Sequence, residues 1–177
     1  MSDSVTDSVV PPTSPEALLA RLDELGVAYV RHDHPPLFTV EDSKALRGDL
    51  PGGHCTNLFL RARKGAMWLV VCLEDRAVDL KALGSLLGGV RLSFGSADRL
   101  MRVLGVVPGA VSPFALINDT AVEVTVILDK AMLAHRPLNY HPLVNTVTIA
   151  VAPEDLVRFV EACGHTPQVL DLDAAAG

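Results

Sequence analysis

The sequence predicts one α+β domain built on a mixed, strongly curved β-sheet. Apolar repeats of three and four residues, typical of amphipathic helices, occur between short β-branched runs typical of strands. The 177 residues suit a single core, which can grow to roughly 200 residues before a chain divides. No internal repeat or low-complexity linker interrupts the chain. We therefore expect one folded unit over residues 14–172, between short tails at residues 1–13 and 173–177.

Helices are expected where a capping residue or a proline precedes an apolar repeat and a glycine follows it. Ser14-Pro15 opens the first such repeat, which Gly26 ends, and Ser96 opens another, which ends at Gly105. The predicted helices cover residues 15–25, 39–46, 79–87, 96–104 and 153–163, and residues 129–134 form a short helical or turn segment.

Strands are expected in the β-branched or alternating runs between these helices. Residues 56–61 and 67–73 flank the loop Arg63-Lys64-Gly65 and are predicted to pair as an antiparallel hairpin. The second of these strands is almost entirely apolar, which places it at the centre of the sheet. The other predicted strands are residues 27–32, 91–94, 122–128, 137–141, 145–151 and 168–170.

Charge and cysteine content narrow the possible functions. The net charge is −6, so a nucleic-acid partner would need a local basic patch rather than the overall field of the protein. Cys55, Cys72 and Cys163 are odd in number and lack metal-like spacing, which argues against a disulfide framework or a zinc site. No apolar run reaches the roughly 18 residues of a membrane span, and the N-terminus lacks a secretory pattern. We therefore expect a cytoplasmic protein with no membrane partner.

Polar residues gather in three short stretches, 53–57, 105–109 and 139–145. The first places reactive side chains at the start of an apolar strand, which is a usual position for a site and equally an ordinary loop-to-strand junction. In the second, two glycines and Pro108 indicate a backbone that comes close to another group, and a structural turn is an equal alternative. The patterns alone leave both interpretations open.

Five motifs follow one another along the chain in a fixed order. They are Gly-Gly-His-x-x-Asn-Leu-Phe-Leu from Gly52, Asp79-Leu80-Lys81, Arg91-Leu92-Ser93-Phe94-Gly95, Gly-Val-x-Pro-Gly-x-Val-x-Pro-Phe-x-Leu-Ile-Asn-Asp from Gly105, and Asn-x-His-Pro-Leu-x-Asn from Asn139. This pattern is similar to the YbaK/ProX-type aminoacyl-tRNA editing family, and within it to the free-standing prolyl-tRNA-synthetase-associated domains, which hydrolyse wrongly charged tRNA in trans. The likeness covers residues 15–171.

The resemblance implies a barrel-like curved sheet with helices packed around it, and a pocket for an aminoacyl group esterified to the terminal adenosine of a tRNA. It implies hydrolysis of that ester by water, without metal, cofactor or covalent intermediate. The reaction needs donors around the ester carbonyl, each worth on the order of 3 kcal/mol. Backbone N–H groups of the loop from Gly105 to Gly109 would supply them. Pro108 would stiffen this loop, and the glycines would let the ester approach.

One position departs from the family. Thr56 stands where most members carry a lysine that is a main functional residue of the site. Threonine donates one hydrogen bond but has no charge and little reach. Three consequences are open: a different substrate amino acid, a catalyst that relies on other groups, or a binding protein that no longer hydrolyses.

The resemblance predicts His141, Asn57 and Thr56 as catalytic residues. We expect Asn57 to orient substrate or water, and His141 to position a water or the ribose hydroxyl. The alternatives are that Asn57 caps the start of its strand and that His141 is an ordinary satisfied polar group.

Other residues are expected at the substrate pocket. Asn145 is either a pocket residue or a turn former, and His34 shapes a turn or the pocket rim. Cys55 and His54 are poorly placed as a nucleophile and its base, because neighbours on a strand point to opposite faces. The predicted substrate-binding residues are Gly105, Pro108, Gly109, His34 and Asn145.

Arg61, Arg63 and Lys64 are predicted to contact tRNA phosphates, with solvated surface as the alternative. Further basic candidates for such contacts are Lys44, Arg91, Arg99 and Arg102.

The expected function is hydrolysis of the aminoacyl ester on a tRNA for proline that carries a small non-cognate amino acid. Prolyl-tRNA synthetase is expected as a further partner, and no role for DNA is expected. The alternative is a non-catalytic module that binds aminoacyl-tRNA or docks on a synthetase.

Overall fold

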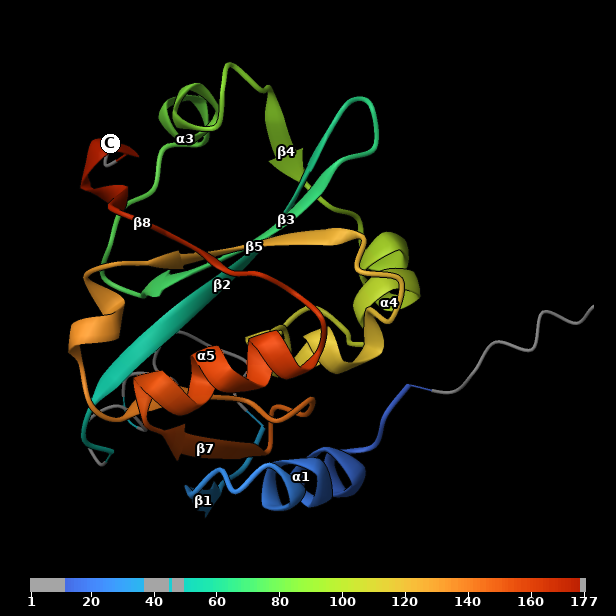
Figure 1. Ribbon diagram of the computed structural model, residues 1–177, viewed down its shortest axis with the longest axis vertical. Coiled ribbons are helices and arrows are strands. Elements are labelled where there is room, and N and C mark those ends of the chain that lie inside the picture. Colours follow the sequence, from blue (N-terminus) through green and yellow to red (C-terminus); the bar gives the residue numbers. More distant parts are fainter. Residues whose placement is uncertain (1–11, 37–44, 46–49, 176–177) are drawn as a thin grey trace, which may run out of the picture.

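The computed structural model describes residues 12–36, 45 and 50–175. Figure 1 shows a curved sheet with helices packed around it, which confirms the predicted α+β class. The predicted helix at residues 39–46 lies outside the described residues, apart from residue 45. None of the helices in the described ranges is long and apolar enough to cross a membrane.

The helices begin where the capping residues predicted them. The Ser14 side chain accepts a hydrogen bond from the Ala17 N–H, and the Ser96 side chain accepts one from the Arg99 N–H. The described helices are α1 (Pro15–Glu24), α3 (Leu80–Leu86), α4 (Ala97–Leu104) and α5 (Pro153–Ala162), with 3-10 turns η1 (Pro113–Asn118), η2 (Met132–Ala134) and η3 (Leu172–Ala175).

Eight strands form one sheet in the order β1-β7-β6-β2-β3-β5-β8, with β4 also paired to β2. The end strands β1 and β8 do not pair with each other in the described structure, so the sheet is curved but not a closed barrel. The predicted hairpin is β2 and β3, although β2 begins at Gly53 and not at Thr56. The strands are β1 (Tyr29–Asp33), β2 (Gly53–Ala62), β3 (Met67–Leu73), β4 (Leu92–Phe94), β5 (Val124–Asp129), β6 (Leu138–Tyr140), β7 (Val147–Val151) and β8 (Gln168–Leu170).

The two faces of the sheet pack against different helices. Residues of α1, α4, α5 and η1 form the main core with one face, where Phe114 packs edge-to-face on Phe159 and Tyr140. A smaller core on the other face joins Leu60, Val70 and Cys72 to α3 and η3. Because side chains alternate along a strand, odd-numbered residues of β2 face the main core and even-numbered residues face the other side.

One edge of β2 pairs with two different strands. Gly53 and His54 pair in parallel with β6, whereas residues 60–62 pair antiparallel with β4. Strand β3 occupies the opposite edge. Residues 55–58 have no paired strand residue on the shared edge in the described structure. We call this interval the open edge of β2.

A buried acidic residue ties the C-terminal segment to the sheet. Asp119 accepts hydrogen bonds from His165 Nε2 at 2.9 Å and from the N–H groups of Glu123 and Val124, each at 2.9 Å. Burial opposes the charged form of Asp119, but these donors outweigh it and lower the pKa of the carboxyl group. His165 follows α5, so the contact holds the end of that helix against the start of β5.

An ion pair holds the last described turn of the chain. Arg76 Nε donates to the fully buried Asp129 Oδ2 at 2.7 Å, and the same guanidinium bonds Asp173 Oδ1 at 2.5 Å. Asp173 lies in η3, whose Leu172 is also fully buried. This contact and the burial of Leu172 hold η3 against the smaller core.

Asp119→Ala should lower the free energy of unfolding by about 3 kcal/mol, because it leaves His165 and a buried N–H without their acceptor. Urea unfolding measures the change. The exposed Asp23 offers a matched control, and Asp23→Ala should cost no more than about 0.5 kcal/mol. Equal effects of the two substitutions would contradict the structural role of Asp119.

Candidate active site

A small cavity lies at the open edge of β2. Its volume is about 240 Å³, and both the strand and the loop that follows α4 contribute to its walls. Asn57 and Phe59 come from β2, Phe94 from the end of β4, and Pro108 and Gly109 from the loop. Residues from two of the stretches that the sequence singled out therefore meet in one cavity.

Asn57 places an unused acceptor beside this cavity. Its side-chain Oδ1 is buried and has no hydrogen-bond partner in the described structure. A buried polar atom without a partner costs about 1–3 kcal/mol. Such a group is explained when a ligand supplies the missing donor. The amide is therefore suited to accept a hydrogen bond from an amino or hydroxyl group of a bound molecule.

The loop opposite Asn57 is a tight turn. The Ala110 N–H donates to the Val107 carbonyl at 3.0 Å, and Gly109 has a φ of 97°. Proline followed by a residue of positive φ is the pattern of a type II turn, and only glycine adopts it without strain. Space beside the Gly109 Cα is open. No acceptor for the Gly109 N–H is found in the part of the chain that the structure describes.

The structure places Gly105 at the end of α4 and not in the wall of the cavity. It ends α4 in the left-handed region at a φ of 66°. A Cβ there would lie 2.7 Å from Asn118 Nδ2, whose amide donates to the Leu104 carbonyl. Gly105 thus permits close packing of the helix end on Asn118 and is not among the residues that line the cavity.

Two histidines and a threonine form a second polar group. His34 Nε2 lies 2.8 Å from Thr148 Oγ1, and His141 Nδ1 lies 2.9 Å from the Val147 carbonyl and 3.4 Å from Thr148 Oγ1. The ring centroids of His34 and His141 are 6.0 Å apart. His34 Nδ1 also lies 2.9 Å from the Pro35 carbonyl. Thr148 was not predicted as a site residue, because nothing in the sequence distinguishes it from the other β-branched residues of its strand.

These contacts determine which ring nitrogen of His141 can react. A carbonyl oxygen only accepts, so Nδ1 must carry the proton that it donates to Val147. Burial lowers the pKa of His141, and the nearby His34 adds to this effect, whereas the Val147 carbonyl opposes it. The ring is therefore neutral at pH 7, and its Nε2 has a lone pair that can accept a proton or a hydrogen bond.

The register brings this group to the same open edge. Strand β6 runs parallel to β2, with Leu138 opposite Gly53 and Asn139 opposite His54. The chain leaves β6 after Tyr140, so the segment from His141 onward departs beside the open edge. The turn is tight, because the Leu143 N–H donates to the His141 carbonyl at 3.0 Å. Leu143 has a φ of 72°, which is rare for a side chain of this kind.

The predicted catalytic residues divide between the two faces of the sheet. Thr56 is paired with Cys72 of the smaller core, whereas Asn57 is paired with Val71 of the main core. Thr148 lies between main-core residues of β7 and so shares the face of Thr56. Thr56 therefore lies on the face of the sheet that carries Thr148 and its histidine partners, whereas Asn57 lines the cavity. Asn145 lies in the turn before β7.

Cys55 adds no nucleophile to this site. Burial raises the pKa of its thiol to about 12, and its Sγ lies 4.0 Å from the Gly53 carbonyl. His54 Nε2 instead contacts the Leu50 carbonyl at 3.0 Å. The described residues also contain no group of three or more His, Cys, Asp or Glu side chains that could hold a metal ion.

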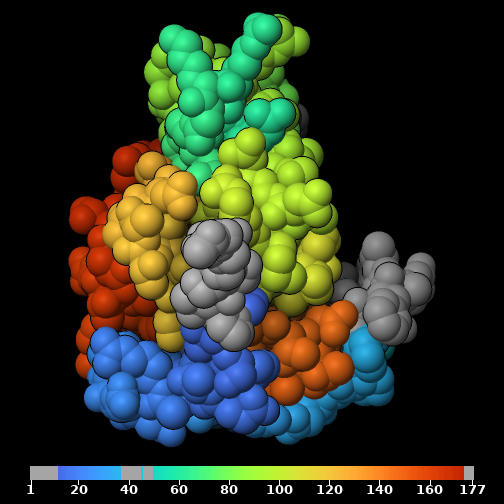
Figure 2. Space-filling view, turned by 90° about the vertical axis from the view of Figure 1, so that its right-hand side faces the viewer, coloured from blue at the N-terminus to red at the C-terminus, as the bar shows by residue number. Residues whose placement is uncertain are grey.

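Three arginines line a groove on the protrusion that the β2–β3 hairpin and β4 form in Figure 2. Arg61, Arg63 and Arg91 surround a volume of about 270 Å³ together with Leu92 and Ser93. None of the three arginines forms an ion pair with another described residue. The three guanidinium groups therefore form a local basic patch on a protein whose net charge is −6. Lys64 lies in the hairpin turn and is not among the groove residues.

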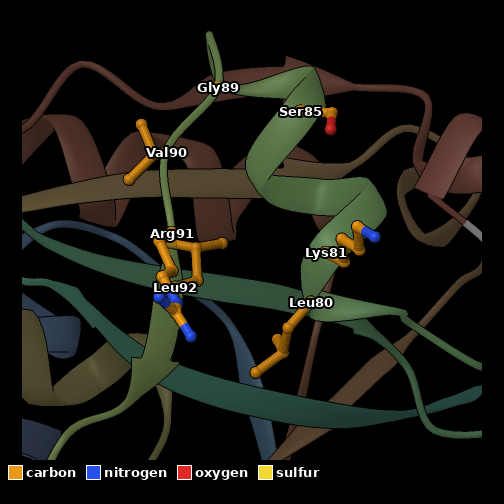
Figure 3. Close-up of a pocket in the computed structure, with 7 residues that line it drawn as sticks. All are labelled: Leu80, Lys81, Ser85, Gly89, Val90, Arg91 and Leu92. Carbon is orange, nitrogen blue, oxygen red and sulfur yellow. The ribbon is translucent and has the colours of Figure 1, made fainter.

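Arg91 also borders a second hollow, of about 510 Å³, on the α3 side of β4. Figure 3 shows Leu80, Lys81 and Ser85 on the helix and the segment from Gly89 to Leu92 facing it. Lys81 and Arg91 point in different directions in this view. The hollow therefore carries the positive charges of Lys81 and Arg91, but these two charges do not converge on one point.

The chain is similar to proteins that are named for tRNA editing. A model of the aminoacyl-tRNA editing domain matches residues 34–159. The prolyl-tRNA editing protein ProX of Acetoanaerobium sticklandii is 38% identical over 158 residues, which cover 89% of this chain and 96% of that protein. The prolyl-tRNA synthetase associated domain-containing protein 1 of Mus musculus is 35% identical, covering 86% of this chain and 93% of its own. A crystal structure of a candidate trans-editing enzyme for prolyl-tRNA synthetase has the same fold, with a TM-score of 0.66 and 17% identity over 90% of this chain and 96% of that one.

His141→Gln should make stability depend less on pH between about pH 7 and pH 5. The pKa of His141 is lowered in the folded protein, whereas a solvated histidine titrates near 6.5. As the pH falls below about 6.5, the unfolded chain gains a proton that the folded chain does not bind, so the wild type loses stability until the folded pKa is reached. Glutamine removes this loss.

Urea unfolding at several pH values measures the effect, and the exposed His135 gives the control His135→Gln. The His141 interpretation would be wrong if His141→Gln retained the full pH dependence of the wild type.

Proposed function

Because the chain belongs to the aminoacyl-tRNA editing domain family, we propose that it hydrolyses, in trans, the ester that joins a wrong amino acid to a tRNA. The observation that carries this proposal is the cavity at the open edge of β2, where the unpaired Asn57 Oδ1 lies across from the Pro108-Gly109 turn. Its volume of about 240 Å³ is smaller than the roughly 300–1,000 Å³ of pockets for drug-sized ligands. The cavity therefore suits a small amino-acid side chain.

The proposed tRNA is the one for proline, carrying a small non-cognate amino acid. Two relatives that align over most of their length are named for prolyl-tRNA editing or for association with prolyl-tRNA synthetase. A small cavity would favour such an amino acid by excluding a larger cognate side chain. Prolyl-tRNA synthetase is the proposed partner, and the cytoplasm, where tRNA is charged, is the proposed compartment.

The chemistry needs a positioned water, a place for negative charge and a donor for the leaving group. Water attacks the ester carbonyl, the carbonyl oxygen becomes an oxyanion, and the bond to the ribose oxygen breaks as that oxygen takes a proton. The Gly109 N–H is suited to the oxyanion, and a donor of this kind is worth about 3 kcal/mol. The neutral Nε2 of His141 is suited to hold the water or the ribose hydroxyl.

The arginine groove is the proposed contact for the tRNA backbone. Arg61, Arg63 and Arg91 present guanidinium groups that pair well with phosphate oxygens. Strand β4 connects this groove with the cavity, because Leu92 and Ser93 line the former and Phe94 lines the latter. A strand of RNA bound along β4 would reach both.

Asn57→Ala should lower kcat/KM for deacylation about 5- to 150-fold, because it removes a hydrogen bond worth about 1–3 kcal/mol to the bound substrate. The assay is release of the amino acid from a panel of mischarged tRNAs. Gln168→Ala, which shortens an exposed amide on the distant edge strand β8, should leave the rate unchanged. If the wild type hydrolysed no member of the panel above buffer, the proposed function would be rejected.

A second function, binding of aminoacyl-tRNA without hydrolysis, is favoured by one observation. Thr56 has no charge and lies on the face of the sheet that carries the histidine group. In the family pattern a lysine stands at this position. Salt-sensitive binding of charged tRNA without turnover would support this second function.

Thr56→Lys separates the two functions. If the site works with threonine, the longer cationic side chain should lower deacylation about tenfold or more, since it adds bulk and charge beside His141. Thr56→Met matches its length without the charge, and Thr56→Val removes only the hydroxyl. A gain of hydrolysis in Thr56→Lys, from an inactive wild type, would favour the binding module instead.

A further inference from the structure

Phe94 exposes an aromatic ring where the two parts of the proposed site meet. Its exposed fraction is 62%, whereas Phe59, Phe114 and Phe159 are buried. Single exposed apolar residues are common, so the position of Phe94 matters more than its exposure.

Strand β4 carries Phe94 from the arginine groove to the Asn57 cavity. Leu92 and Ser93 line the groove, and Phe94 itself lines the cavity. Figure 1 shows β4 beside the β2–β3 hairpin and just before α4. A ligand that contacts the arginines with phosphates and the cavity with an ester would pass this ring.

The backbone around Phe94 is firmly held. Phe94 is paired with Leu60 of β2, so its side chain lies on the same face of the sheet as Leu60 and Thr56, at the edge of β2 where the cavity lies. The Gly95 N–H donates to the Phe59 carbonyl at 2.9 Å. A Cβ at Gly95 would lie 2.4 Å from the Phe59 ring, so the strand is pressed directly onto that ring. Ser96 then caps α4. The ring is therefore attached to a rigid support, which lowers the entropy cost of using it in binding.

We propose that Phe94 is the stacking platform for the terminal adenine of the tRNA. This inference rests on the proposed function. The ester is attached to the ribose of the terminal adenosine, so an ester in the Asn57 cavity brings the base on the same ribose close to Phe94. The 3′ end of tRNA is unpaired, and unpaired bases stack on exposed aromatic rings. Phe94 is thus a positioning residue that holds the nucleotide, not a group that takes part in the chemistry.

The test uses an uncharged acceptor-stem RNA hairpin with 2-aminopurine in place of the terminal adenine. Stacking quenches 2-aminopurine, so the wild type should lower its fluorescence on binding. Phe94→Ala should abolish this quenching and weaken binding about 5- to 150-fold, since stacking is worth about 1–3 kcal/mol per base. Phe94→Tyr should retain both effects, whereas Phe94→Leu, which keeps apolar area without an aromatic face, should lose the quenching.

Val169→Ala, at an exposed apolar position on β8, is the matched control and should resemble the wild type. Undiminished quenching and affinity in Phe94→Ala would overturn the stacking role while RNA binding by the wild type still supported the proposed function. Failure of the wild type to bind the hairpin would overturn the stacking role as well. The mischarged-tRNA panel, which needs no fluorescent base, then decides separately whether the proposed function also fails.

Discussion

The candidate site depends on the way in which β2 shares one of its edges. A single partner along the whole edge would satisfy its backbone groups and leave no room for a ligand. Instead β6 arrives in parallel at one end and β4 arrives antiparallel at the other. The chain must leave β6 and β4 beside the interval between them. The chain that leaves β6 continues into His141, and the chain that leaves β4 continues through Gly95 into α4 and the loop after it.

This arrangement carries local costs that the two cores offset. The buried Oδ1 atoms of Asn57 and Asn139 have no partner in the described structure, and Leu143 adopts a positive φ. Each such feature costs on the order of 1–3 kcal/mol. Asn57 lies in β2, Asn139 lies in β6, and Leu143 lies in the turn that follows β6. The amide of Asn139 also donates to the carbonyls of Pro51 and Gly53, which fixes the approach to β2.

Local signals made much of the fold predictable. Ser14 and Ser96 cap helices as expected, and the hairpin of β2 and β3 follows from two apolar runs around a short polar loop. The open edge was not predictable, because it depends on which distant strands pair with β2. For the same reason the sequence did not place Arg91 beside Arg61.

The site was predicted as three stretches, and the structure separates roles within them. Adjacent residues of a strand face opposite ways, so Thr56 and Asn57 cannot serve the same side of the sheet. Gly105 and Gly109 look alike in the sequence, yet one ends a helix against Asn118 and the other forms a turn with open space beside it. Thr148 had no local signal, since only the packed sheet brings it to His34.

The burial of the cysteines has a consequence for the durability of the site. Burial raises the pKa of Cys55 to about 12 and those of Cys72 and Cys163 to about 11. Only the thiolate reacts readily with peroxide or with electrophiles. At neutral pH all three thiols are therefore almost entirely protonated, which slows their reaction with oxidants. The strand that supports the candidate site thus includes a cysteine whose burial protects it against oxidation.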